Sequence, residues 1–116
     1  MNEYILIFRH TPVEGFTPSL KQQTETVQHW QKWIGEIAAQ VKFVSTNRIG
    51  FEGAVVQPSN EVIDGFYQDS TTNEAVSGNM IVKSDSLSEA TEIAKGCPIL
   101  AMGGTVEVRN LIPMKA

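Results

Sequence analysis

The N-terminal third of the chain changes from a continuous apolar run to a helical spacing of apolar residues. Residues 4–8 form a short apolar run closed by Arg9, which predicts a central strand buried on both faces. Residues 11–18 contain two prolines and a glycine and predict a loop. Ser19 and Gln22 have the spacing of a capping box, so we expect a helix from Leu20 to about Gln40. Its apolar stripe recurs every three or four residues and comprises Val27, Trp30, Ile34, Ile37 and Val41, widened by Trp33 and Ala38.

The middle of the chain predicts a hairpin followed by a polar loop. Residues 43–56 contain apolar stretches interrupted by Gly50 and Gly53, which indicates broken strand structure. A turn signal at residues 57–60 separates this segment from a return strand at residues 61–67. Residues 68–74 are polar and predict an exposed loop.

The C-terminal third predicts a strand, a helix and a final strand. Residues 76–83 have strand character, and Ser86 with Glu89 forms a second capping-box pattern that opens a helix through Lys95. In residues 105–112 Val106 and Val108 alternate with charged positions, which predicts a half-buried strand. The resulting order, β-α-β-β-β-α-β, is that of an α+β, ferredoxin-like antiparallel sheet with two helices on one face, in a single domain over residues 1–116.

Bulk composition narrows the function classes. With 116 residues the chain is long enough for one core, and its net charge of −4 without a basic block argues against nucleic-acid binding. No run approaches the roughly 20 apolar residues of a membrane span. The lone Cys97 and an N-terminus without a signal-peptide pattern favour a cytoplasmic protein.

Five segments of the C-terminal half resemble the YCII-related, DGPF-type proteins. They are Asp64-Gly65, residues 74–78 (Glu-Ala-Val-Ser-Gly), residues 84–90 (Ser-Asp-Ser-Leu-Ser-Glu-Ala), residues 96–98 (Gly-Cys-Pro) and residues 103–109 (Gly-Gly-Thr-Val-Glu-Val-Arg). The chain departs from the family where Asp-Gly-Pro-Phe reads Asp-Gly-Phe-Tyr, and where a Gly-Gly-aromatic strand reads Ser-Gly-Asn at residues 77–79. Residues 42–59 match the family poorly.

The resemblance implies a homodimer in which the open faces of two sheets pack together as a dimeric α+β barrel. It implies no settled activity, because members include proteins of unknown role, fusion partners of regulatory proteins and at least one ring-dehalogenating lyase. A His–Asp pair has been suggested as the working dyad of shorter members, and its nearest equivalents here are His29 and Asp64.

Each candidate for chemistry also has a purely structural interpretation. His29 is a natural proton carrier or a surface residue at the edge of the helical stripe, and Asp64 is a general base or a turn residue. Arg9 at the strand end suits an anionic ligand or is a loop cation next to a solvated His10. Arg109 shares a face with Glu107 and suits an anionic ligand or a cross-strand or cross-dimer ion pair. Trp33 and Phe66 suit a flat ring or the core. The motif spacings of metal, phosphate-loop and nucleophile-elbow sites are missing, so we expect no metal and no cofactor.

Two main functions therefore stay open, and a purely structural dimer without a ligand is a third, weaker alternative. One is a cofactor-independent lyase or isomerase, in which His29 moves a proton, Asp64 orients it, and Arg9 or Arg109 binds a small anionic or ring substrate. The other is a non-catalytic, dimeric module that binds a small ligand or serves as a regulatory interaction partner. A His29 side chain that points into bulk solvent would remove the dyad.

Overall fold

The computed structural model describes residues 1–12 and 19–114 of the chain. They form an α+β fold with the elements β1 (Asn2–His10), α1 (Leu20–Ala39), β2 (Phe43–Arg48), β3 (Ala54–Val56), β4 (Val62–Asp64), β5 (Ala75–Ser84), α2 (Leu87–Ala94), the 3-10 helix η1 (Pro98–Met102) and β6 (Thr105–Asn110). Most of the loop predicted at residues 11–18 lies outside the described residues.

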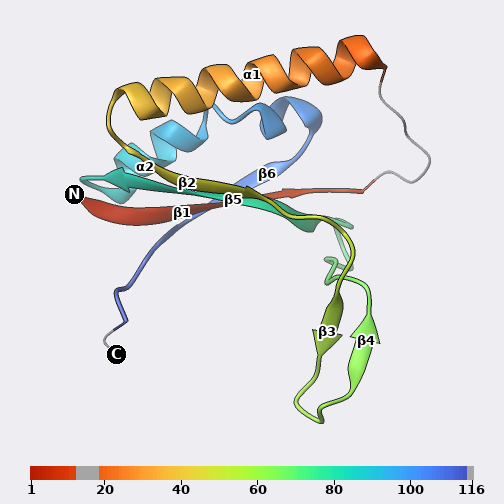
Figure 1. The fold of residues 1–116 in the computed structure, drawn as a ribbon. Coiled ribbons are helices and arrows are strands. Elements are labelled where there is room, and N and C mark those ends of the chain that lie inside the picture. Colours follow the sequence, from red (N-terminus) through yellow and green to blue (C-terminus); the bar gives the residue numbers. More distant parts are fainter. Residues whose placement is uncertain (13–18, 115–116) are drawn as a thin grey trace.

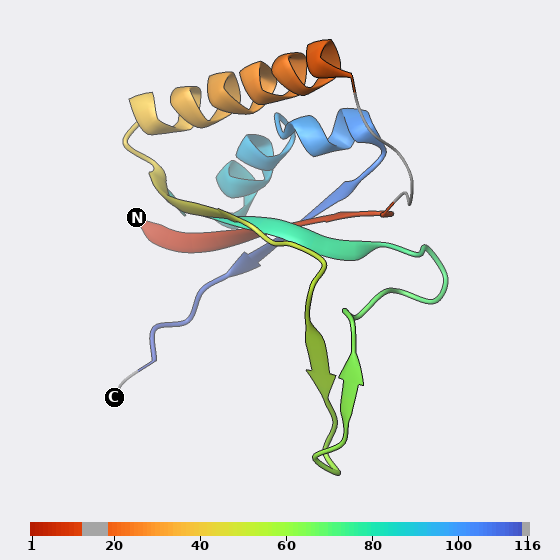
Figure 2. The ribbon, with the colours of Figure 1, turned by 45° about the vertical axis from the view of Figure 1, so that its right-hand side comes forward.

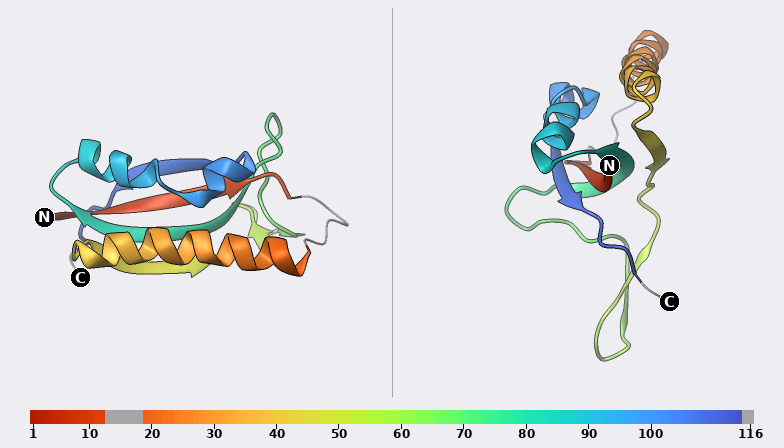
Figure 3. Two further views of the ribbon diagram at one scale, coloured as in Figure 1. Left: turned by 90° about the horizontal axis from the view of Figure 1, so that it is seen from above. Right: turned by 90° about the vertical axis from the view of Figure 1, so that its left-hand side faces the viewer.

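The strands form one main sheet and one small sheet. The four-stranded sheet has the order β2-β5-β1-β6, and each neighbouring pair is antiparallel. The two helices and η1 cover one face of this sheet (Figure 1), with α1 running beside α2 and η1 when viewed from above (Figure 3). The prediction of two helices on one face of an antiparallel sheet is confirmed at this level.

The hairpin prediction is confirmed, but the hairpin does not join the main sheet. Strands β3 and β4 pair only with each other, and they project from the face opposite the helices (Figure 1). The segment at residues 43–56 therefore divides into two strands, because residues 49–53, with Gly50 and Gly53, turn away from the main sheet. The return strand is shorter than predicted and ends before Gly65, whose φ of 108° favours glycine.

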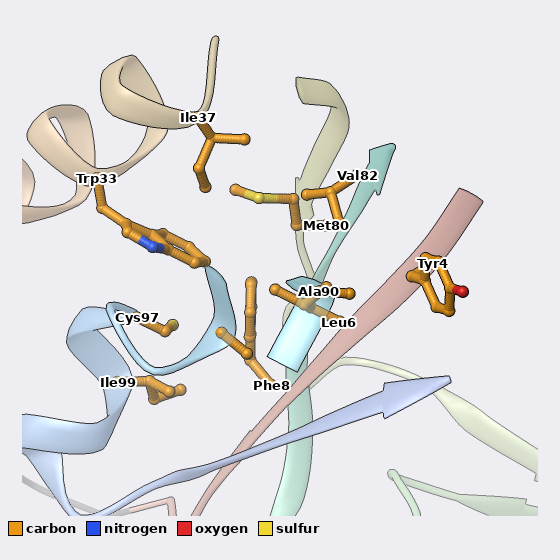
Figure 4. Close-up of a cluster of buried hydrophobic side chains, with 11 residues drawn as sticks. Tyr4, Leu6, Phe8, Trp33, Ile37, Met80, Val82, Ala90, Cys97 and Ile99 are labelled. Carbon is orange, nitrogen blue, oxygen red and sulfur yellow. The ribbon is translucent and has the colours of Figure 1, made fainter. Parts of the chain in front are cut away.

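The core lies between the helices and the sheet (Figure 4). Tyr4, Leu6 and Phe8 of β1 point into it, whereas Ile5 and Ile7 are half-buried on the other face. Burial of β1 on both faces, predicted from its continuous apolar run, is therefore wrong for one subunit, since no layer covers the second face in the described structure.

Helix α1 begins as the sequence predicts, but its predicted stripe is only partly buried. Ser19 and Gln22 form both hydrogen bonds of the capping box. Trp33 and Ile37 are buried, while Val27 is exposed and Val41 lies after the helix with a positive φ. Every residue from 20 to 29 is exposed, so the first half of α1 has no core to face.

Candidate functional site

A cleft of about 590 Å³ lies on the open face of the sheet, at the end from which the hairpin projects. The C-terminal end of β1, the N-terminal ends of β5 and β6 and the loop from β4 to β5 converge there (Figure 2). Its walls combine charged and apolar side chains, namely Arg9, Ile49, Phe66, Glu74, Val76 and Glu107. This cleft is the candidate site.

Arg9 and Glu107 form the charged wall of the cleft. The two residues lie on adjacent strands and share the open face, and Arg9 Nη1 donates a hydrogen bond to Glu107 Oε1 at 2.7 Å. Arg109, two positions further along β6, donates to Glu107 Oε2 at 3.3 Å. Glu107 and Arg109 share one face of β6, as the alternation of the strand predicts. Arg109 pairs with Glu107 along its own strand, whereas the cross-strand partner of Glu107 is Arg9 of β1.

The arginines lower the pKa of the Glu107 carboxyl, mainly through the hydrogen bond from Arg9 and then through that from Arg109. A carboxyl whose pKa is lower in the folded state stabilises the fold above its unfolded pKa, and that contribution is lost as pH falls through the folded value. We expect the Glu107 carboxyl to titrate below the ordinary value of 4.5. Carbon-detected NMR of the side chain measures this midpoint, and Arg9→Gln should move it back toward 4.5. An identical midpoint in the variant would contradict the assignment to Arg9.

The other two carboxylates of the cleft are engaged in local structure. Asp69 Oδ1 accepts hydrogen bonds from the backbone N–H groups of Thr71 and Thr72, and these bonds lower the pKa of Asp69. Glu74 accepts a hydrogen bond from Thr105 Oγ1. Both groups therefore shape the loop and the strand ends, and the charge of the cleft as a whole is acidic.

Aromatic rings connect the end of β1 to the base of the hairpin. His10 contacts Phe51 edge-on with ring centroids 5.9 Å apart, and Phe51 contacts Phe66 at 4.9 Å. Nδ1 of His10 is buried without a hydrogen-bond partner in the described structure. Phe66, which lines the cleft, is thus held by a chain of rings that begins at His10.

Of the seven residues singled out from the sequence, four lie at or beside the cleft, one lies in the core, and two are exposed elsewhere. Arg9 and Phe66 line the cleft, His10 supports Phe66 through Phe51, and Arg109 contacts Glu107 from outside the lining. Trp33 lies in the core on the helical side, where its Nε1 donates to the backbone oxygen of Ile93 at 3.1 Å.

His29 and Asp64 are not brought together within the chain. His29 is exposed on α1, which covers one side of the sheet, and Asp64 is exposed on β4, which projects from the other side (Figure 1). No hydrogen bond or ion pair joins them among the described residues. The proton-transfer geometry that a dyad needs is therefore not formed in one subunit.

Sequence reasoning missed Phe51, Glu74 and Thr105 as parts of this region. Thr105 had a detectable signal, because it begins the alternating strand that holds Glu107. Phe51 had none, since the glycines around it obscure any strand period, and its contacts with His10 and Phe66 span long sequence separations. Cys97 is buried in the core, and burial raises the pKa of its thiol to about 11.

Together these features define an α+β protein with an open antiparallel sheet and a cleft at one end of that open face. No protein-family model matches the chain, and no curated protein matches it. Among the described helices none is long and apolar enough to cross a membrane. Residues 1–12 and 19–114 also contain no group of three His, Cys, Asp or Glu side chains placed to hold a metal ion.

Proposed function

We propose that this chain is a non-catalytic, small-ligand-binding module of the YCII-related type that acts as a homodimer. The strand order β2-β5-β1-β6 with both helices on one face supports a ferredoxin-like subunit. Three half-buried isoleucines, Ile5, Ile7 and Ile81, line the centre of the uncovered face. Packing two such faces together would shield them from water and form a dimeric α+β barrel.

The observation that carries the binding role is the position of Arg9 in the wall of the cleft. Its side chain is 33% exposed, and only Nη1 forms a hydrogen bond with a described residue. The guanidinium has further N–H donors in a fixed planar arrangement, which suits a carboxylate or carbonyl oxygen of a ligand. Apolar walls from Ile49, Phe66 and Val76 suit a ring next to that oxygen.

The acidic groups of the cleft restrict the ligand further. Asp69, Glu74 and Glu107 outnumber the single arginine that lines the cleft, so phosphate or another multiply charged anion is repelled more strongly than a ligand with a single carboxylate. The ligand class that fits is a small ring compound with one carboxylate or carbonyl group. A cofactor-independent lyase or isomerase is less well supported, because His29 and Asp64 lie on opposite sides of the sheet in one subunit.

Benzoate is a minimal ring monocarboxylate. Comparison of its affinity for the wild type and for the Arg9→Gln variant tests this proposal. We expect benzoate to shift the backbone NMR signals of residues that line the cleft, such as Val76 and Val106. A hydrogen bond to a charged group contributes about 1.5–3 kcal/mol, so Arg9→Gln should weaken binding roughly tenfold or more. Arg48→Gln is the matched control, because Arg48 is exposed at the end of β2 and does not line the cleft.

Inorganic phosphate in the same titration should leave these signals unchanged. Saturable phosphate binding at the cleft would contradict the proposed ligand class. Absence of saturable binding across a set of ring monocarboxylates, or equal weakening in Arg9→Gln and Arg48→Gln, would reject the binding role of Arg9.

A further inference from the structure

The hairpin is an arm that pairs with no other strand among residues 1–12 and 19–114 of its own subunit. We define the arm as residues 52–65, which contain β3, β4 and the turn between them. Val56, Val62 and Ile63 are 66%, 60% and 50% exposed. A two-stranded hairpin alone is marginally stable in water, and here its apolar side chains face solvent.

The shape of the chain agrees with an arm that reaches outward. The radius of gyration is 15.9 Å, whereas a compact chain of this length would have roughly 13 Å. From the sheet to the hairpin tip the chain extends about 20 Å at ~3.3 Å per residue, and two packed sheets lie about 10 Å apart. The arm is therefore long enough to pass the edge of a second sheet packed on the open face.

The arm and the loop that follows it carry charge of one sign. Residues 49–82 contain no Lys or Arg and five acidic residues, which are Glu52, Glu61, Asp64, Asp69 and Glu74. Three of the five belong to the arm itself. An interface that covers the exposed apolar side chains of the arm must also accommodate these carboxylates, so its partner surface should be basic and partly apolar.

Two cations lie at the opposite end of the open face, where Lys83 is opposite Glu3 across β5 and β1 and the largely exposed Arg109 also contacts Glu107. Lys83 of β5 and Arg109 of β6 share this face by strand alternation, and Lys83 makes no ion pair with any described residue. The segment that follows β6 adds the exposed apolar residues Ile112 and Met114. This segment leaves the sheet on the same side as the arm but at the other end (Figures 1 and 2). We call Lys83, Arg109, Ile112 and Met114 the basic end.

A two-fold axis between two subunits can bring the arm of each beside the basic end of the other. If two open faces pack around an axis that crosses the strands, the arm of each subunit lies beside the basic end of the other, so the contact between arm and basic end occurs twice in the dimer. An axis along the strands would instead bring both acidic arms to the same end of the dimer. Charge complementarity therefore favours the first arrangement.

We propose that a second copy of this chain occupies the space beside the arm, and that each arm clasps the basic end of its partner. This inference rests on the dimer proposed above and adds the arrangement of the subunits. Val56 and Val62 share one face of the hairpin with Asp64 and then cover Ile112 and Met114 of the opposite subunit. Asp64 on this face and Glu61 beside the turn meet Lys83 and Arg109.

A charge-swap experiment tests the clasp with two variants of the full chain. The arm variant carries Glu61→Lys and Asp64→Lys, and the end variant carries Lys83→Glu and Arg109→Glu. Each homodimer then has two repulsive contacts, whereas the mixed dimer has two attractive ones. We expect each variant alone to dimerise at least tenfold more weakly than the wild type in sedimentation equilibrium, and native mass spectrometry of the mixture to show predominantly heterodimers. Glu25→Lys, on the exposed part of α1, is the control and should dimerise normally.

The outcomes separate this inference from the proposed function. A monomeric wild type would reject the dimer and the clasp together, while benzoate binding still tests the cleft. A dimeric wild type whose end variant also dimerises normally, or whose variants mix statistically, would overturn the clasp and leave the dimer in place. Misfolding of a single variant is distinguished by the mixture, because recovery of a heterodimer requires both chains to fold.

Discussion

Leu6→Ala is expected to lower the free energy of unfolding by about 3–5 kcal/mol, the largest effect of a single substitution that we predict. Leu6 is 0% exposed at the centre of β1, and its neighbours across the sheet are Met80 on β5 and Val108 on β6. Removal of its side chain leaves a cavity that the two flanking strands cannot close without breaking their pairing. Urea denaturation followed by tryptophan fluorescence measures the change, since Trp33 is in the same core.

Ile7→Ala is the matched control for Leu6→Ala. Ile7 is the next residue of β1, but it is half-buried and faces the open side of the sheet. Within one subunit we expect Ile7→Ala to cost less than half as much, because less apolar area leaves a buried environment. Equal losses for the two variants in a monomeric sample would contradict the assignment of the two faces of β1.

Gly104→Ala is expected to destabilise the fold by about 2–3 kcal/mol through overpacking. A Cβ atom at this position would lie 2.5 Å from the backbone oxygen of Arg9 and 2.7 Å from Cγ1 of Ile99. The backbone of Arg9 is held by pairing with β5 and β6, so it cannot yield as a flexible side chain would. Because Arg9 also lines the cleft, the variant should shift the NMR signals of the site as well as the unfolding midpoint.

Gly35→Ala separates this steric effect from the general effect of replacing glycine. Gly35 lies within α1, and nothing lies within 4 Å of the position that its Cβ would take. Alanine is more favourable than glycine in a helix by about 1 kcal/mol, so this variant should be more stable than the wild type. A Gly104→Ala protein as stable as the wild type would show that β1 and η1 can separate without loss.

Local signals in the sequence were sufficient for most of the elements. The capping box at Ser19 predicted the start of α1, and the alternation around Val106 and Val108 predicted the faces of β6. The turn at residues 57–60 predicted the hairpin. These features depend on residues within a few positions of one another, and such short-range physics can be derived from one chain.

The site could be predicted only in part. Arg9 and Phe66 were identified as candidates from their residue types, but the cleft also depends on Glu74 and Glu107. The contact between Arg9 and Glu107 spans 98 positions in the sequence, so no local pattern reports it. The same limit explains why the separation of His29 and Asp64 was not predicted. No local pattern near either residue indicates on which side of the sheet it will lie.

The amino-acid pattern alone was enough to establish an α+β chain with two amphipathic helices and the facing of β6, because propensity, capping and periodicity act locally. Only the folded arrangement decided that β3 and β4 leave the main sheet, that Arg9 meets Glu107, and that the dyad candidates are separated. Those outcomes follow from the order of strands and from the direction in which residues 49–53 turn, which depend on packing among segments far apart in the chain.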